Sequence, residues 1–252
     1  MILDNILALA ESEVGYLEKK SNSKMDDKTA NAGDKNYTKY SRDLVNKIGS
    51  PFSNGVAWCQ MFVTWLFVMI VGLQQAKSIL GGWTAYTPTA ANFYKQQGRW
   101  FSKPQRGDQI FFKNSTRICH TGIVYKVDSR FVYTIEGNTS SSAGVVPNGG
   151  GVFKKKYLLS NSRIAGYGRP NYNDNTSTTN PYQEPTQIIK KGSKGEGASW
   201  VQFQLQRAGY QIDVDGDFGK ISDSILRTYQ ASHNLDDDGE CGRLTRESLK
   251  KY

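Results

Sequence analysis

The sequence predicts an α+β domain followed by a small helical domain, and three patterns support this division. Residues 59–71, thirteen mostly apolar residues without Gly or Pro, predict a buried helix. The alternating stretches 120–127 and 131–135, separated by Asp-Ser-Arg, predict two paired strands. Near the end of the chain, Asp-Gly-x-x-Gly occurs at 215–219 and its counterpart at 238–242, and each copy predicts a tight turn ahead of a helix.

The first residues predict an amphipathic helix rather than a secretory leader. Asp4 and Asn5 interrupt the apolar pattern, and no basic residue precedes it. The longest apolar run, Met61–Leu73, has thirteen residues and contains Thr64, whereas a helix that spans a bilayer needs about 20 residues. We therefore expect synthesis in the cytoplasm without a signal peptide, and no membrane insertion.

Cys59 and His120 are the candidate nucleophile and base. Residues 51–55 break regular structure ahead of Cys59, so its thiol is expected at the N-terminus of the next helix, where partial positive charge favours a thiolate. His120 opens the first alternating strand and can take the thiol proton and return it to a leaving amine. The chain has two histidines, and His233 lies in the C-terminal module, so His120 is the expected partner of Cys59.

A third polar group is expected to orient the ring of His120. Thr134, Glu136 and Asn138 are spaced two apart on the second strand and should share one face. One of them can accept a hydrogen bond from the ring nitrogen that faces away from Cys59, which would set the histidine tautomer. Glu136 and Asn138 both remain candidates for this role.

Each of these residues also has a structural explanation. A lone cysteine before an apolar helix is more often a buried small side chain, a lone histidine in a strand is more often structural, and Glu-Gly-Asn is an ordinary turn sequence. Their joint occurrence in this order favours a cysteine-dependent amide hydrolase. The three cysteines do not predict a disulfide framework: Cys119 is expected to be a buried thiol, and Cys241 an exposed one in a turn.

Aromatic residues in two turn-rich segments are candidate substrate contacts. Residues 29–40 are expected to form a loop near the catalytic groove, and residues 82–88 another wall of it. Such rings stack on sugars and pack against peptides, but they also fill protein cores. The four candidates are Tyr37 and Tyr40 in the first segment and Trp83 and Tyr86 in the second.

Residues from about 8 to 172 resemble the CHAP family of cysteine, histidine-dependent amidohydrolases/peptidases. The resemblance implies a papain-like α+β fold and a peptidoglycan hydrolase with Cys59 as nucleophile and His120 as base. Glu136 would orient the histidine, with Asn138 as a supporting polar group. The matching segments are Ala57-Trp58-Cys59, Arg-Gly-Asp-Gln-Ile-Phe-Phe at 106–112, His-Thr-Gly-Ile-Val at 120–124 and Thr-Ile-Glu-Gly-Asn at 134–138.

The remaining chemistry is expected to need no metal or organic cofactor. Papain-like enzymes often carry a Gln six residues before the cysteine, but Ser53 stands there, so the backbone N–H of Cys59 is the expected oxyanion donor. The acidic residues near 213–217 do not follow the spacing of a calcium loop, because Phe218 and Ser224 occupy the positions that need Gly and Glu.

Residues 190–252 predict about three helices built as a repeat. Ser222 and Thr245 follow the two turns at equal offsets and are expected to be helix N-caps, and Gln206 and Gln230 precede the turns as apparent equivalents. This repeat resembles the small peptidoglycan-binding domain of many wall hydrolases. Its expected core residues are Val201, Leu205, Phe218, Ile225, Tyr229, Leu235, Leu244 and Leu249.

The polar stretch 173–185 indicates a linker, expected over 173–189, which assigns 1–172 to the catalytic domain. Residues 1–172 carry 22 Lys/Arg against 11 Asp/Glu, a balance of +11, whereas residues 173–252 carry 10 against 12, a balance of −2. This field favours polyanionic partners, here peptidoglycan carboxylates and teichoic acids. Lys154-Lys155-Lys156 is expected to be a solvated turn, and without a recognition motif no nucleic-acid partner is expected.

These patterns predict a monomeric bacterial cell-wall lytic enzyme that cuts an amide bond of peptidoglycan through a thioester. An N-acetylmuramoyl-L-alanine amidase is favoured on resemblance alone, and a stem or cross-bridge endopeptidase is the alternative. From another class, a non-catalytic wall-binding protein remains possible. The layout resembles a bacteriophage or prophage endolysin, released by lysis or through a holin pore to act on the wall of a Gram-positive host.

Overall fold

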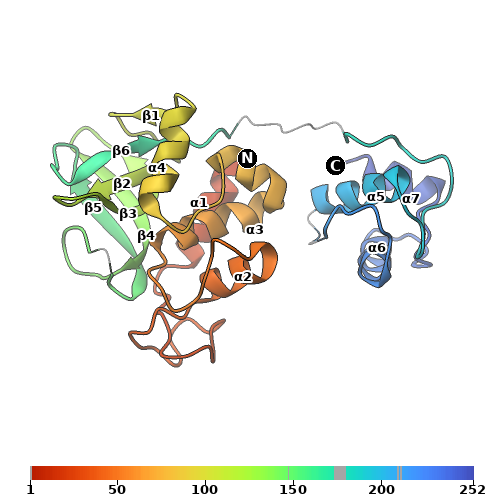
Figure 1. The fold of residues 1–252 in the computed structure, drawn as a ribbon, viewed down its shortest axis with the longest axis horizontal. Helices are drawn as coiled ribbons and strands as arrows, with labels where there is room; N and C mark the ends of the chain where they lie inside the picture. Colours follow the sequence, from red (N-terminus) through yellow and green to blue (C-terminus); the bar gives the residue numbers. More distant parts are fainter. Residues whose placement is uncertain (1, 147, 173–179, 209, 211) are drawn as a thin grey trace. The chain divides into compact units, whose positions relative to one another are not determined.

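A six-stranded antiparallel sheet organises the first of the two units into which the chain divides, Met1–Asp174 and Asn175–Tyr252 (Figure 1). The computed structural model describes the chain except residues 1, 147, 173–179, 209 and 211. The strands lie in the order β1-β6-β2-β3-β4-β5. Their bounds are β1 Trp100–Phe101, β2 Gln109–Lys113, β3 Ile118–Val127, β4 Phe131–Thr139, β5 Gly151–Leu158 and β6 Ile164–Gly168.

Helix α3, Cys59–Leu80, is the central helix of this unit and packs against β3 and β4. The residues from Met61 to Val68 are almost completely buried, as expected for a helix that is apolar on all sides. The helix is longer than the predicted 59–71, because the chain kinks at Gly72 (φ 75°) and then resumes helical geometry. The other helices of this unit are α1 Ile2–Ser12, α2 Lys39–Ile48 and α4 Thr87–Gln96.

Within the described residues, α3 is the one helix long and apolar enough to cross a bilayer. It has 22 residues, so the expectation that this segment is too short to span does not hold for the helix as a whole. Its first three turns are enclosed by the core of the N-terminal unit, which is the position of a core helix in a folded domain.

Strands β3 and β4 form the predicted hairpin. At its turn, the Asp128 carboxylate accepts hydrogen bonds from the backbone N–H groups of Arg130 and Phe131 at 2.9 and 2.8 Å. The two faces of the sheet pack differently. One face contributes Ile123 and Ile135 to the core shared with the helices. The other face forms a second core, whose buried members are Ile110, Phe112, Val124, Val132, Tyr157 and Tyr167.

The C-terminal unit contains the three predicted helices, α5 Glu196–Arg207, α6 Lys220–Ser232 and α7 Arg243–Leu249. Together the two units confirm the predicted fold class, an α+β domain followed by a small helical domain. The internal repeat is built around two buried glutamines. The side-chain amide of Gln202 bonds Asp215 Oδ1, Asp217 O and Ser222 Oγ, and its carbonyl accepts from Gly216 N.

Gln230 repeats this arrangement in the second turn. Its amide bonds Asp238 Oδ1, Glu240 O and Thr245 Oγ1, and its carbonyl accepts from Gly239 N. The equivalent of Gln230 is therefore Gln202 and not Gln206, whose amide instead bonds Ile212 O.

Three further expectations about this unit are wrong. The N-caps of α6 and α7 are Gly219 and Gly242, whereas Ser222 and Thr245 lie in the first turn of each helix and bond the buried glutamines. Leu244 is 63% exposed and belongs to no core. Cys241 is fully buried, because its backbone pairs with Ile189 across an isolated bridge.

The linker is shorter than the expected 173–189. Asn180 donates from its amide to Trp200 O, and Tyr182 packs on the core of the C-terminal unit. Ile189 is buried in that core. Residues 180–189 therefore belong to the C-terminal unit, and the rest of the expected linker, 173–179, lies outside the described residues.

Candidate active site

Cys59 is the first residue of helix α3, as the sequence predicts. Its N-cap, Trp58, has non-helical geometry (φ −122°, ψ 13°), and the first intrahelical bond runs from Phe62 N to Trp58 O. The N–H of Cys59 is therefore among the helix-terminal donors that have no acceptor within the helix. Cys59 is buried, with 5% of its surface exposed, and it lies at the positive end of the helix dipole.

His120 and Glu136 form a fully buried pair on neighbouring strands. Glu136 Oε2 lies 2.9 Å from Nε2 of His120, and neither side chain has exposed surface. Nδ1 is the ring nitrogen left for Cys59; it is buried and has no hydrogen bond of ordinary geometry within the described residues. Long nucleophile–base contacts are common in enzymes without substrate.

The charges around His120 favour its protonated form. Burial alone would lower the pKa of the imidazole, but interactions with Cys59 and Glu136 outweigh burial and raise this pKa to about 10. The ring of His120 is thus held in its protonated form near neutral pH, beside the candidate nucleophile Cys59.

Two hydroxyl groups hold the carboxylate of Glu136. Thr134 Oγ1 donates to Oε1 at 2.5 Å, and the hydroxyl of Tyr157 lies 3.2 Å from Oε2. Phe112 packs on both the Tyr157 ring and the imidazole of His120. Thr134 and Glu136 share a face as predicted, but Tyr157 comes from β5 and could not be placed at the site from local sequence spacing.

Asn138 lies two residues after Glu136, beyond the end of the regular β4–β5 pairing. The β4–β5 pairing shifts register between Glu136 and Thr139, and Asn138 has φ of 56° at this irregularity. Its side chain is fully buried, and its backbone carbonyl accepts from Gly149 N. Of the two candidates, the structure brings Glu136 to the imidazole, because the bulge ends the regular alternation that the sequence pattern assumes.

Two glycines of the motifs make room for this site. A Cβ at Gly122 would collide with the side chain of Glu136, and a Cβ at Gly137 would collide with Trp58 and Phe62. The first glycine therefore admits the carboxylate beside β3, and the second lets the start of α3 approach β4. This close approach brings Cys59 toward the strand that carries Glu136.

Further buried polar residues join the start of α3 to the rest of the unit, and the sequence analysis missed them. Gln109 on β2 donates to Gln60 Oε1 at 2.8 Å and to Thr121 Oγ1 at 2.9 Å, so it links the residues that follow Cys59 and His120. Trp58 Nε1 donates to the buried carboxylate of Glu18 at 2.9 Å. The sequence holds one hint of the first link, a glutamine next to the apolar residues 110–112. It holds no hint of the second, because Glu18 is far from Trp58 in the chain.

Tyr40 is a core residue, so its prediction as a substrate contact is wrong. It lies on the inner side of α2, has no exposed surface, and stacks among Trp58, Phe62 and Trp65. Its hydroxyl donates to Glu13 at 2.7 Å. Tyrosine in an amphipathic helix packs inward, whereas the sequence analysis assumed a loop there.

The other three aromatic candidates keep some exposed surface. Tyr37 is half-buried and lies beside Gly55, which belongs to the segment just before Cys59. Trp83 is half-buried against the core, near Phe52. Tyr86 is 51% exposed, and the guanidinium of Arg117, from the turn before β3, lies 5.3 Å from its ring centre. Their contact with substrate stays a prediction.

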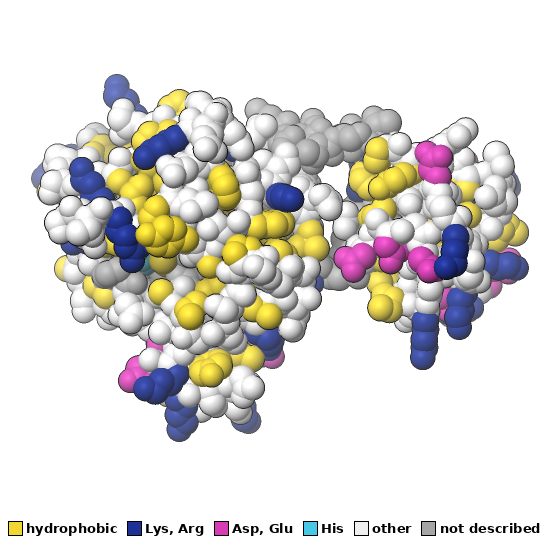
Figure 2. All heavy atoms as spheres, viewed as in Figure 1, with side chains coloured by type: hydrophobic (Ala, Val, Ile, Leu, Met, Phe, Trp, Pro, Cys, Tyr) yellow, Lys and Arg dark blue, Asp and Glu magenta, His cyan; other side chains and the backbone are white. Residues whose placement is uncertain are grey.

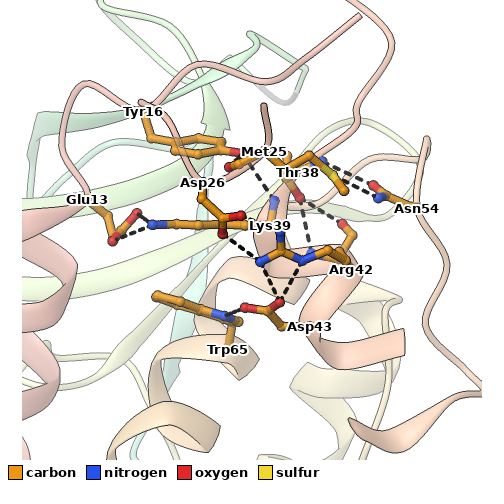
Figure 3. Close-up of polar contacts among 11 residues, drawn as sticks. Glu13, Tyr16, Met25, Asp26, Thr38, Lys39, Arg42, Asp43, Asn54 and Trp65 are labelled. Atoms are coloured by element: carbon orange, nitrogen blue, oxygen red, sulfur yellow. Dashed lines mark hydrogen bonds and ion pairs between the residues drawn. The ribbon is translucent and has the colours of Figure 1, made fainter. Parts of the chain in front are cut away.

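An ion-pair network fixes the loop between α1 and α2, as Figure 3 shows. Arg42 binds both carboxylate oxygens of Asp26 at 2.7–2.8 Å and also contacts Asp43, which accepts from Trp65 Nε1 at 2.9 Å. Asn54 accepts from Thr38 N at 3.1 Å. The loop is thereby tied to the segment immediately before Cys59.

Two family matches follow the division of the chain into units. Residues 51–138 match the CHAP domain, and residues 194–249 match the peptidoglycan binding domain. The chain carries a CHAP domain followed by a peptidoglycan-binding domain. The CHAP match contains Cys59, His120, Glu136 and Asn138, and the two matches together support a cell-wall hydrolase.

Several solved structures resemble parts of this chain. The Burkholderia AP3 phage endolysin is 32% identical over 25% of this chain and 24% of its own, with a TM-score of 0.25. The SleB N-terminal domain is 34% identical over 27% of this chain and 96% of its own, with a TM-score of 0.27. Ly7917 is 15% identical over 67% and 62%, with a TM-score of 0.38. The chain thus covers about a quarter of the AP3 endolysin, and no curated protein matches it.

Proposed function

We propose that this protein hydrolyses an amide bond of bacterial peptidoglycan with Cys59 as nucleophile. The thiolate attacks the amide carbonyl carbon, and His120 gives its proton to the nitrogen as the C–N bond breaks. Water then attacks the resulting thioester, with His120 accepting its proton, and the acid product leaves as Cys59 is regenerated. Glu136 holds the imidazole in place through Nε2, and the N–H of Cys59 stabilises the oxyanion.

The single observation that carries this proposal is the Cys59, His120 and Glu136 arrangement. A buried histidine between a helix-terminal thiol and a carboxylate has its pKa raised to about 10 by those two neighbours, against the effect of burial. A histidine buried in an apolar core without such partners would lose its proton instead. The arrangement therefore supports catalysis over a retired, binding-only site.

The C-terminal unit is proposed to hold the enzyme on its polymeric substrate. Its family match supports peptidoglycan as the bound polymer. Linking a binding module to a catalytic one raises the local concentration of cleavable bonds. Deleting residues 180–252 should therefore weaken adsorption to purified walls, while leaving cleavage of small soluble muropeptides intact.

Among the possible bonds, we favour the N-acetylmuramoyl-L-alanine amide, with a stem or cross-bridge peptide bond as the alternative. Mass spectra of the soluble products from purified Gram-positive peptidoglycan distinguish them. Free stem peptides with L-alanine N-termini would establish the amidase. Muropeptides still joined to sugar, with new amines in the stem or bridge, would establish the endopeptidase. Products no different from those of the Cys59→Ala protein would overturn hydrolysis and favour a non-catalytic wall-binding protein.

A further inference from the structure

The β3–β5 region carries a row of aromatic and basic side chains on the side of the sheet opposite Glu136. Along β4, Val132 and Thr134 are buried on the side of Glu136, so Phe131 and Tyr133 project from the other side. Tyr133 is paired with Lys126 on one neighbouring strand and with Lys156 on the other. We call this surface the basic face; its residues are Tyr125, Lys126, Arg130, Phe131, Tyr133, Lys154 and Lys156.

This surface was not expected from the lysine triplet. Lys154–Lys156 was predicted to be a solvated turn, but it lies within strand β5. Strand alternation places Lys154 and Lys156 on the exposed side, while Lys155 points inward and donates to the backbone carbonyls of Ser140 and Ser142. Sequence patterns did not reveal that this segment pairs with β4. Because it is a strand, its lysines lie on alternate sides of the sheet instead of all facing solvent.

The cations of the basic face rest on aromatic rings. Lys156 Nζ lies 4.5 Å from the ring centre of Phe131, and Lys126 Nζ lies 5.0 Å from that of Tyr133. The guanidinium of Arg130 lies 5.4 Å from the Phe131 ring centre. A ring holds a cation in place without neutralising it, unlike a carboxylate.

Few acids oppose these cations. Within the described residues, Lys126, Arg130 and Lys156 form no ion pair within 4.0 Å, whereas Lys154 pairs with Glu11. The nearby acid is Asp128, whose carboxylate accepts from the Tyr133 hydroxyl at 2.7 Å and from two backbone N–H groups and also attracts Lys126. The basic face therefore keeps a positive surplus, within a domain whose overall balance is +11. Figure 2 likewise shows few acidic side chains among the cations of the N-terminal unit in that view.

We propose that the basic face binds the repeated phosphate groups of an anionic cell-wall glycopolymer. The cations are held in place by the rings and are not neutralised by acids, so they can attract the successive phosphate charges of a flexible polymer. Nucleic acid fits less well, because sequence-tolerant binding of bases uses open ring faces, and here the ring faces are covered by Lys and Arg. The wall location rests on the proposed function, but no part of this binding requires hydrolysis.

The basic face is displaced along the sheet from the catalytic site. Tyr133 is three residues from Glu136 along β4, a separation of about 10 Å at the usual strand rise, and it lies on the side of Ile135, where α1 and α3 also pack. A polymer on this surface can therefore hold the CHAP unit against the wall while Cys59 acts on peptidoglycan.

The test compares two triple variants in the full-length Cys59→Ala protein, which cannot degrade its target. Lys126→Gln/Arg130→Gln/Lys156→Gln removes three cations of the basic face. Lys20→Gln/Lys77→Gln/Lys103→Gln removes three exposed cations elsewhere in the same unit and gives the same net charge. The probe is a fluorescent poly(glycerol phosphate), and its Kd is measured by anisotropy at several salt concentrations.

The basic-face variant should bind this probe at least tenfold more weakly than the control variant. The slope of log Kd against log salt should also fall by roughly two, taking the release of about 0.7–0.9 of a counterion per phosphate contact that holds for nucleic acids. Equal loss in both variants would overturn the proposal, since net charge alone would then explain binding. Equal or tighter binding of single-stranded DNA with the same number of phosphates would also overturn it. Both results are independent of whether the wild-type protein hydrolyses peptidoglycan.

Discussion

Glu136 Oε2 lies 2.9 Å from Nε2 of His120, and both side chains are fully buried. Because this contact uses Nε2, Nδ1 is the ring nitrogen left for the thiol of Cys59. His120 therefore lies between Glu136 and Cys59, although the three residues are far apart in the sequence. A carboxylate buried in this way would be costly without partners. Here the imidazolium and two hydroxyl groups supply them.

The titration of His120 should depend on Cys59. In the wild type its pKa is expected near 10, so the ring stays protonated through neutral pH and loses its proton as pH rises through that value. Removing the sulfur in Cys59→Ala should lower this pKa, because burial is then opposed by Glu136 alone. NMR of the two histidine rings measures this directly, with His233 as the internal control. An unchanged His120 pKa would contradict the proximity of the thiol.

Replacing Glu136 by Gln should keep the shape of the site and remove its charge. We expect kcat/KM on soluble muropeptides to fall by roughly 10²–10⁴, with a lowered pKa of His120, since the imidazolium loses its anionic partner. The matched control is Glu13→Gln, which alters another buried carboxylate, one that bonds Tyr40 and Lys39. If both variants lost the same activity, the effect would be one of folding.

Tyr157 should tune the site through Glu136. Its hydroxyl lies 3.2 Å from Oε2 of Glu136 and 3.3 Å from Gly144 O, and its single proton can favour only one of them at a time. In Tyr157→Phe the carboxylate loses a donor and becomes more negative toward the ring, so the pKa of His120 should rise further. We expect a three- to tenfold fall in kcat.

The control for this experiment is Tyr94→Phe. Tyr94 is also buried, and its hydroxyl donates to Gln109 Oε1 at 3.0 Å. The substitution therefore removes a buried hydroxyl that makes no bond to Glu136. It should lower thermal stability and leave the His120 titration unchanged. If His120 had the same pKa in Tyr157→Phe and Tyr94→Phe, the hydroxyl of Tyr157 would have no effect on the site beyond packing.

The two buried glutamines should stabilise the C-terminal unit. Gln202→Ala and Gln230→Ala each leave several buried polar groups unpaired, and each should cost about 2–4 kcal/mol of unfolding free energy. Gln206→Ala, which removes one partly buried bond to Ile212 O, should cost less than about 1.5 kcal/mol. Thermal or denaturant unfolding of the full chain measures the difference. Similar losses at positions 202 and 206 would contradict the assigned repeat.

Local patterns were enough to predict the parts of the site that depend on one element at a time. The helix that starts at Cys59 and the β3–β4 hairpin follow from residue periodicity and from breakers at their ends. Tyr40 and Gln206 were misjudged for a different reason. Which side of a helix faces the core, and which glutamine reaches a turn, are decided by packing between elements.

Features that depend on strand pairing were beyond the sequence pattern. The bulge after Glu136 ends the regular alternation, so Glu136 and Asn138 do not occupy equivalent positions. It could not be predicted from β4 alone, because it is defined by the pairing of β4 with β5. Tyr157 reaches the carboxylate through the same pairing. The C-terminal end of the linker was misplaced because Ile189 is held by a bridge to Cys241, more than fifty residues away.

The most direct test of cysteine catalysis is the rate at which purified peptidoglycan is solubilised by the wild type, Cys59→Ala and Cys119→Ala. Cys119 precedes His120 but is only partly buried, and its sulfur lies 3.9 Å from Arg163 Nη2. We predict that Cys59→Ala lowers the rate at least about 10³-fold, while Cys119→Ala stays within about twofold of the wild type. Solubilisation by Cys59→Ala at a rate close to that of the wild type would contradict the proposed mechanism.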